Sequence, residues 1–138
     1  MKVLRVSFVG TRTTDFEATI GMFRDVLGLE QAFVNPGWAG FHVPSGERDL
    51  LEVFGRPDVD HRVVPEEFRS GVLVAFAVDD VATARGELAA AGIELIGDLV
   101  WATDLTGDAA NRGWGWCFFR GPDGNVYVLQ QDGLTNLD

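Results

Sequence analysis

The chain has 138 residues, the usual size of one domain, and 46% of them are hydrophobic, which is enough to build a core. Its 11 basic and 21 acidic residues give a formal net charge of −10. A surface this acidic repels phosphate backbones and anionic lipids, so nucleic-acid binding and membrane-surface binding are the first functions to be excluded. A cationic small molecule or a basic partner would instead be attracted.

Cysteine content and hydropathy argue against a secreted or membrane-embedded protein. The single cysteine, Cys117, cannot form an intramolecular disulfide. Arg5 and Ser7 interrupt the apolar start of the chain, so a secretory signal is not expected. The longest apolar run, Gly71–Val78, is far shorter than the roughly 20 residues that a membrane span needs. We therefore expect a cytoplasmic protein.

The first part of the chain predicts a strand, a helix and three short strands. Apolar and polar residues alternate over Val3–Val9, which is typical of a strand with one packed face. Thr14 and Glu17 form a capping-box pattern, and Gly28 stands where a glycine would end the helix. The apolar stripe of this helix is Phe16, Ile20, Phe23 and Leu27. Three strands bounded by turn sequences follow at Glu30–Val34, Trp38–Val43 and Leu50–Phe54.

The second part repeats this order after a polar connector, Gly55–Ser70. A strand at Gly71–Val78 precedes a helix that Asp79 or Asp80 caps and Gly92 ends. The segment Thr103–Arg112 is rich in Gly, Asp and Asn, which favours a mobile loop. The remaining strands are expected at Ile93–Ile96, Trp114–Phe119 and Asn125–Gln130, and Gly121–Gly124 forms the hairpin between the last two.

An internal repeat links the two parts. Asp15, Ala18, Thr19, Gly28 and Glu30 recur 64 positions later as Asp79, Ala82, Thr83, Gly92 and Glu94. Several identities in one ungapped register indicate a duplicated module. The predicted fold is therefore α+β, with two tandem βαβββ modules. Module one takes residues 1–54, the linker 55–70 and module two 71–138, all within a single domain.

Three segments carry a family resemblance. They are Asp15–Thr19 with its continuation Phe23–Glu30, then Phe76–Val81, and finally Arg120–Tyr127. In this order they resemble the vicinal oxygen chelate superfamily, which holds glyoxalase I, the bleomycin and fosfomycin resistance proteins and the extradiol dioxygenases. The resemblance implies that the two modules form a cupped half-barrel of mixed sheet, with the helices outside and the ligand site in the cup.

The resemblance also implies metal ligands, and this chain lacks most of them. Enzymes of the family usually place His on the first strand and Glu on the last strand of each module. Here alternation predicts Arg5, Ser7 and Val9 as the inward residues of the first strand, and the second-module positions fall on Leu73 and Val128. Only Glu52 keeps a residue type that binds divalent metals. We therefore expect no metal and no cofactor, and a character closest to the metal-free, bleomycin-resistance-like members.

Arg5 and Glu52 are expected at neighbouring positions of the cup. There they could hold a polar group of a ligand through charge-assisted hydrogen bonds, or could form a purely structural ion pair. The sequence leaves both readings open.

Tryptophan is the other abundant candidate for the site. Trp114 and Trp116 lie two residues apart on one expected strand, so both point to the same face. They could form a wall for a flat or cationic ligand, or could pack in the core or against a dimer mate. The candidate ligand-binding residues are Arg5, Ser7, Trp38, Glu52, Trp114, Trp116 and Gln130.

The two histidines and the cysteine are weaker candidates. His42 and His61 could join Glu52 in an atypical metal site, although no tight ligand spacing supports one. A surface position is the simpler reading for both. Cys117 has no neighbouring cation to stabilise a thiolate, so we expect a buried hydrophobe.

These observations favour a metal-independent protein that binds a small molecule, in a sequestration or resistance role, with a preference for a cationic or aromatic ligand. The alternative is a glyoxalase-like lyase, isomerase or dioxygenase with an atypical metal site, or an enzyme that uses Glu52 alone as an acid–base group. A third reading is a structural module whose cup is filled by its own side chains. Homodimerisation is expected because it is common in the family.

Overall fold

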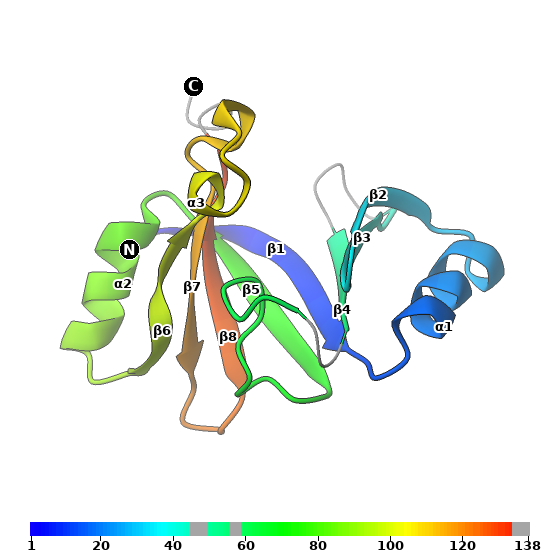
Figure 1. Ribbon diagram of the computed structural model, residues 1–138. Coiled ribbons are helices and arrows are strands. Elements are labelled where there is room, and N and C mark those ends of the chain that lie inside the picture. Colours follow the sequence, from blue (N-terminus) through cyan, green and yellow to red (C-terminus); the bar gives the residue numbers. More distant parts are fainter. Residues whose placement is uncertain (45–49, 56–58, 134–138) are drawn as a thin grey trace. The chain divides into compact units, whose positions relative to one another are not determined.

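Eight strands and three α-helices make up the part of the chain that the computed structural model describes, residues 1–44, 50–55 and 59–133 (Figure 1). The first part holds β1 (Val3–Arg12), α1 (Phe16–Gly21), a π-helical turn (Met22–Val26), β2 (Glu30–Asn35), β3 (Trp38–His42) and β4 (Leu50–Phe54). The second holds β5 (Val72–Val78), α2 (Val81–Ala90), β6 (Glu94–Trp101), α3 (Ala102–Thr106), a 3-10 turn (Ala109–Asn111), β7 (Gly115–Arg120) and β8 (Val126–Gln131). The predicted α+β class and the order βαβββ–βαβββ are confirmed. The turn expected between the strands predicted at Trp38–Val43 and Leu50–Phe54 includes residues 45–49, which lie outside the described residues.

Strand order supports the duplication. Four strands follow the order β2-β3-β4-β1, and the other four follow β6-β7-β8-β5. Each set therefore places its last strand beside its first strand. The β1–β4 pair is parallel, whereas the pairs β2–β3, β3–β4, β6–β7 and β7–β8 are antiparallel, so the pairing is mixed as expected.

The first helix begins one residue later than the sequence predicts. Asp15, not Thr14, is the N-cap residue, and its carboxylate accepts a hydrogen bond from Ala18 N at 3.1 Å. The helix then widens into the π-turn, in which Leu27 N donates to Met22 O at 3.0 Å. This wider turn changes the side-chain spacing and leaves Leu27 58% exposed, so the prediction that Leu27 joins the apolar stripe is wrong. Leu29 packs instead against the core that Ile20 of α1 forms with Phe41 and Val53.

The second helix and the segment after β6 are also well defined. Asp80 caps α2 by accepting from Thr83 N at 3.0 Å, which resolves the choice between Asp79 and Asp80. The segment expected to be a mobile loop, Thr103–Arg112, instead contains most of α3 and the 3-10 turn. Asp108 caps that turn by accepting from Ala110 N at 2.9 Å. Local side-chain capping therefore supplies the order that the polar composition obscured.

The chain forms two compact units, and the expected module boundaries stay a prediction. One unit contains residues 1–6 and 75–138, and the other contains residues 7–74. The first residues of β1 thus group with the second set of strands, and the connector groups with the first set. Within the described residues, no helix combines the length and apolarity needed to cross a membrane.

Each unit has its own core between a helix and one face of its strands. In the unit 7–74, Ile20 of α1 packs against Ala39, Phe41 and Val53. In the other unit, Val81 and Ala84 of α2 pack with Val78, Cys117 and Leu129. Since side chains alternate along a strand, the residues between these core positions lie on the opposite face of the strands.

Candidate functional site

Glu52 lies on the face of its strands that α1 does not cover. Its neighbours in sequence, Leu51 and Val53, belong to the core beneath α1, so the Glu52 side chain points the other way. In register, Glu52 lies between Gly10 of β1 and Gly40 of β3. Paired residues of adjacent strands share a face, so the carboxyl group has a glycine on each side.

Aromatic rings occupy the space above both glycines. A Cβ atom at Gly40 would lie 2.3 Å from Cε1 of Phe33, and one at Gly10 would lie 2.8 Å from Cε2 of Phe54. The two rings therefore rest directly on the backbone on either side of Glu52. Only glycine leaves room for this arrangement, which gives Gly10 and Gly40 a defined role.

Trp38 holds the Glu52 carboxyl group. Its indole Nε1 donates a hydrogen bond to Oε1 of Glu52 at 2.7 Å, and its ring meets Phe33 edge to face with centroids 5.1 Å apart. The other oxygen, Oε2, accepts no hydrogen bond from the described residues. We call Glu52, Trp38, Phe33, Phe54, Gly10 and Gly40 the Glu52 cluster.

Burial changes the acidity of Glu52. The residue is only 6% exposed, and removal of its carboxylate from water raises its pKa to about 7, against the lowering effect of the Trp38 hydrogen bond. At neutral pH the group is therefore divided between the acid and the carboxylate. It can donate a proton, accept one, or pair with a cation.

Residues that pair across β1, β4 and β3 form a row on each side of Glu52, and the two rows contain different types of side chain. On one side, Phe8 of β1 and His42 of β3 flank Leu50 of β4. On the other side, Arg12 and Trp38 flank Phe54. Over residues 8–12 the alternation predicted for the first strand is thus wrong by one residue, because Phe8, Gly10 and Arg12 share the face of Glu52. Ser7 is buried on the opposite face.

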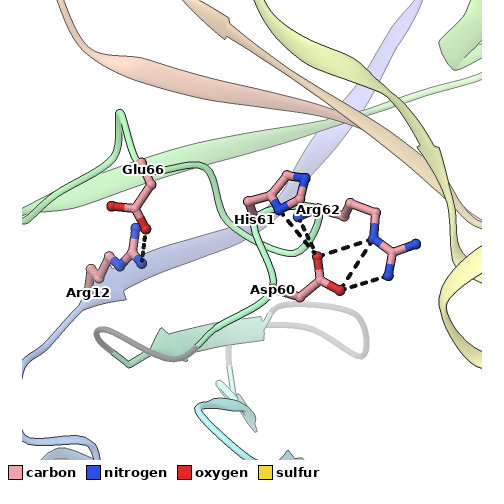
Figure 2. Close-up of polar contacts among 5 residues, drawn as sticks. All are labelled: Arg12, Asp60, His61, Arg62 and Glu66. Atoms are coloured by element: carbon pink, nitrogen blue, oxygen red, sulfur yellow. Dashed lines mark hydrogen bonds and ion pairs between the residues drawn. The ribbon is translucent and has the colours of Figure 1, made fainter.

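Arg12 is a buried cation that ties the connector to β1. Its side chain is completely buried, and it donates to the carbonyl oxygens of Gly55, Pro65 and Phe68 at 3.3, 2.9 and 2.8 Å. Its Nη2 also lies 3.8 Å from Oε1 of the exposed Glu66 (Figure 2). The sequence reasoning missed this residue, since an arginine at the end of a strand normally reaches solvent.

The connector also contains a separate surface pair. Asp60 accepts hydrogen bonds from the backbone and the guanidinium group of Arg62, which lowers the pKa of Asp60 to about 2 (Figure 2). His61 is 83% exposed with its Nδ1 4.0 Å from Oδ1 of Asp60. His61 thus has the surface position that the simpler reading gave it.

Three other expected site residues come together in the unit that holds residues 1–6 and 75–138. Arg5 donates from Nη2 to Oδ2 of Asp132 at 2.5 Å, and Gln130 Nε2 lies 3.5 Å from Oδ1 of the same carboxylate. Trp116 of β7 pairs in register with Gln130 of β8. We call these four residues the Asp132 cluster. Asp132 was missed because it lies beyond the last predicted strand.

Arg5 and Glu52 each have a partner within their own unit, Asp132 and Trp38 respectively. Their expected pairing with each other stays a prediction.

Trp114 and Trp116 do not lie on one strand. β7 begins at Gly115, so Trp114 precedes it, and its carbonyl oxygen accepts from Ala102 N at 2.9 Å. Its indole lies over Gly133, where a Cβ atom would come within 2.1 Å of Nε1. Trp116, by contrast, lies on the face of β7 that α2 does not cover, because its neighbour Cys117 is in the α2 core.

The donor set of these residues does not fit a metal ion of the kind that family enzymes hold. Among the described residues, no group of three or more His, Cys, Asp or Glu side chains could bind one. Leu73 and Val128, at two of the positions where the resemblance implies ligands, are buried apolar residues. The residues that pair with Glu52 on the adjacent strands are glycines, which have no side chain to bind a metal. His42 pairs with Leu50, one row away from Glu52.

Cys117 is buried in the α2 core, as predicted. Burial raises its pKa to about 11, so the thiol stays protonated at neutral pH.

The fold and the sequence together define the family. The model of the Glyoxalase/Bleomycin resistance protein/Dioxygenase superfamily matches residues 5–129, and the chain belongs to this superfamily. A comparison with curated proteins finds no match.

Solved structures with the same fold include enzymes of more than one activity. Methylmalonyl-CoA epimerase from Mycobacterium tuberculosis has a TM-score of 0.70 and 20% identity, over 97% of this chain and 91% of that chain. A variant of methylmalonyl-CoA epimerase from Streptomyces coelicolor has a TM-score of 0.66 and 19% identity, over 95% and 99%. The Mn(II)-bound glyoxalase from Novosphingobium aromaticivorans also gives 0.66 with 20% identity, over 95% of this chain and 40% of that longer chain. Identities this low establish the fold alone.

Proposed function

We propose that this protein binds a small organic molecule against the Glu52 cluster without a bound metal ion, and that it favours a cationic or aromatic ligand. A sequestration or resistance role, a cytoplasmic location and a homodimer are parts of the same proposal. The arrangement of Glu52 between Phe33 and Phe54 carries it, since it combines a buried carboxyl group with aromatic rings on one sheet face.

Physical chemistry supports this choice of ligand. The faces of aromatic rings attract cations, and a carboxylate removed from water interacts more strongly with a charged partner than an exposed one does. The net charge of −10 adds a long-range field that speeds the encounter with a cation. The absence of a three-ligand metal group among the described residues favours direct contact between ligand and side chains.

A ligand screen with two readouts tests the proposal. Small aromatic and cationic compounds are added to the isotope-labelled protein in the presence of EDTA, and the NMR signals of the Trp38 indole and the Glu52 carboxyl group are followed. Shifts at both groups in the wild type, together with loss of the Glu52 shift in Trp38→Ala, support binding at the Glu52 cluster. Binding that disappears in EDTA and returns with Mn²⁺, Fe²⁺, Zn²⁺ or Ni²⁺ would contradict the metal-independent part.

Elemental analysis of protein purified without a metal-affinity tag tests the same point directly. Near-stoichiometric metal would redirect attention to Glu52, His42 and His61 as ligands of an atypical enzyme site.

A second candidate function is proton transfer, with Glu52 as the general base. A carboxyl group with a pKa of about 7 matches the pH at which it would work, which is the condition for efficient acid–base catalysis. Structural relatives include enzymes named methylmalonyl-CoA epimerases, whose name describes a change of configuration at one carbon. Incubation with methylmalonyl-CoA in D₂O, followed by NMR, tests for exchange of the α-proton. Exchange that is absent in Glu52→Gln supports catalysis, and no exchange above the buffer rate contradicts it for this substrate.

A further inference from the structure

The two oxygens of the Glu52 carboxyl group differ in their surroundings. Oε1 accepts the hydrogen bond from the Trp38 indole, whereas Oε2 accepts none from the described residues. Oε2 is not among the fully buried atoms that lack a hydrogen-bond partner, so it is the oxygen that a donor group of a bound molecule can approach.

The rings beside Oε2 narrow the choice of donor. The ring of Phe33 lies over Gly40 and that of Phe54 over Gly10, the glycines that pair with Glu52 in register, and neither ring offers a hydrogen-bond donor or acceptor. Their faces do attract positive charge. A group that satisfies both demands must carry a positive charge and an N–H bond at the same atom.

We infer that the ligand of this site is a protonated primary or secondary amine, whose N–H group donates to Oε2 of Glu52 beside the partly buried ring of Phe33. This inference rests on the proposed binding function and makes it specific. A quaternary ammonium ion lacks the N–H bond, and an alcohol lacks the charge, so each meets only one of the two demands.

Binding is then linked to a proton. An ammonium group pairs with the ionised carboxylate, so the fraction of Glu52 that is protonated must release its proton to the buffer. Burial and the Trp38 hydrogen bond are the two causes of the shifted pKa of Glu52. The other charged or titratable side chains of this face, Arg12 on β1, His42 on β3 and Glu30 on β2, lie in the rows to either side. Near pH 7 about half a proton is released for each amine bound.

Isothermal titration calorimetry with three probes of one shape tests the inference. The probes are benzylamine, benzyltrimethylammonium and benzyl alcohol, each at pH 7 in two buffers with different ionisation enthalpies. We expect benzylamine to bind about tenfold more tightly than either of the others, which corresponds to one charge-assisted hydrogen bond. Its apparent enthalpy should depend on the buffer, and that of benzyl alcohol should not.

The variant Glu52→Gln keeps the size of the side chain and removes its charge. It should lose the preference for benzylamine and the buffer dependence. A measurement on the wild-type protein covers the case in which this variant does not fold. In that measurement, saturating benzylamine should move the ¹³C-detected pKa of Glu52 well below 7.

The outcomes separate this inference from the function on which it rests. Equal affinity for benzylamine and benzyl alcohol, or benzylamine binding with an unchanged Glu52 pKa, overturns the amine inference and leaves small-molecule binding standing. If no probe binds and none moves the signals of Trp38 or Glu52, both are overturned.

Discussion

The indole of Trp38 donates a hydrogen bond to the carboxyl group of Glu52 across 2.7 Å, and the two residues lie on adjacent antiparallel strands. An indole N–H can only donate, so this bond favours the ionised form of the carboxyl group. Burial favours the neutral form. The pKa of about 7 is the balance between the two, which makes it sensitive to a change in either.

Replacing Trp38 with Phe should raise the pKa of Glu52 further. The variant keeps an aromatic ring beside Phe33 but removes the donor, so only burial remains to set the acidity. We expect a rise of about one pH unit or more, as the loss of one hydrogen bond to a charged group implies. The ¹³C carboxyl shift of Glu52, followed between pH 5 and pH 10, measures it. Trp116→Phe is the matched control, and a lower pKa in Trp38→Phe would show that water enters the site instead.

The raised pKa of Glu52 also predicts how stability changes with pH. The folded group has a pKa of about 7 and the unfolded group about 4.5, so the folded state holds the proton more tightly. The contribution of Glu52 to stability is therefore greatest below pH 4.5, falls as the pH rises from 4.5 to 7, and is level above 7. The difference amounts to roughly 3 kcal/mol.

Glu52→Gln isolates this contribution from those of the other acidic residues. The free energy of unfolding by urea is measured for both proteins at several values between pH 4 and pH 8. The stability of Glu52→Gln relative to wild type should increase by roughly 3 kcal/mol over this range. A difference that stays constant with pH would mean that Glu52 titrates normally.

Substitution of Gly40 by Ala should be destabilising, because the new Cβ atom would lie 2.3 Å from the Phe33 ring. Either the ring leaves its place beside Glu52 or the strands move apart, at a cost of about 1–3 kcal/mol. Gly86→Ala is a control of opposite sign, since Gly86 lies in α2 with no atom within 4 Å of the added Cβ. There we expect a gain of up to about 1 kcal/mol.

Thermal unfolding of the two glycine variants gives the comparison, and the Trp38 indole signal reports whether the Phe33 ring has moved. An unchanged stability and an unchanged indole signal in Gly40→Ala would contradict the tight contact of Phe33 with the backbone.

We expect Arg12 to hold the connector, residues 55–70, against β1. Arg12→Met keeps the aliphatic part of the side chain but leaves the carbonyl oxygens of Gly55, Pro65 and Phe68 without their guanidinium donor. A loss of roughly 3 kcal/mol follows from breaking a buried charged network. Amide hydrogen exchange should accelerate at Val64 and Phe68, two buried hydrophobic residues of the connector.

The exposed pair in the same connector supplies the control. Arg62→Met removes the partner of Asp60 at the surface, where a change of less than about 0.5 kcal/mol is expected. Equal effects of the two arginine variants would show that Arg12 holds nothing in place.

Much of the fold could be predicted from periodicity and turn residues, because both report on local geometry. The repeat of Asp15 at Asp79, together with Gly28 and Gly92 at the helix ends, correctly predicted two copies of one βαβββ unit. The errors occur where a single residue changes the register: the π-turn that exposes Leu27, and the one-residue shift that brings Phe8 rather than Ser7 to the face of Glu52. Alternation gives the period of a strand but not its phase, which depends on the neighbouring strands.

The candidate site was predicted in part for the same reason. Glu52 and Trp38 were both named from the sequence, but their mutual hydrogen bond depends on the pairing of β3 with β4. The roles of Gly10 and Gly40 depend on rings that reach across from adjacent strands, and no local pattern carries that information. Asp132 escaped notice because its partner, Arg5, lies at the other end of the chain.

The pair of Arg5 and Asp132 should be energetically coupled. Asp132 is only 8% exposed, and Arg5 donates to it at 2.5 Å, so removal of Arg5 takes the guanidinium partner away from a poorly hydrated carboxylate. A double-mutant cycle with Arg5→Met and Asp132→Asn measures the coupling, for which we expect about 1–3 kcal/mol. The loss in Arg5→Met should be partly recovered when Asp132→Asn is added, because the carboxylate that has lost its guanidinium partner is then replaced by an uncharged amide. Gln130→Ala tests the weaker 3.5 Å contact with the same carboxylate and should cost clearly less than Arg5→Met. Additive effects of the two main substitutions would contradict the coupling, and would mean that this ion pair does not hold the first residues of β1 to the unit that contains Asp132.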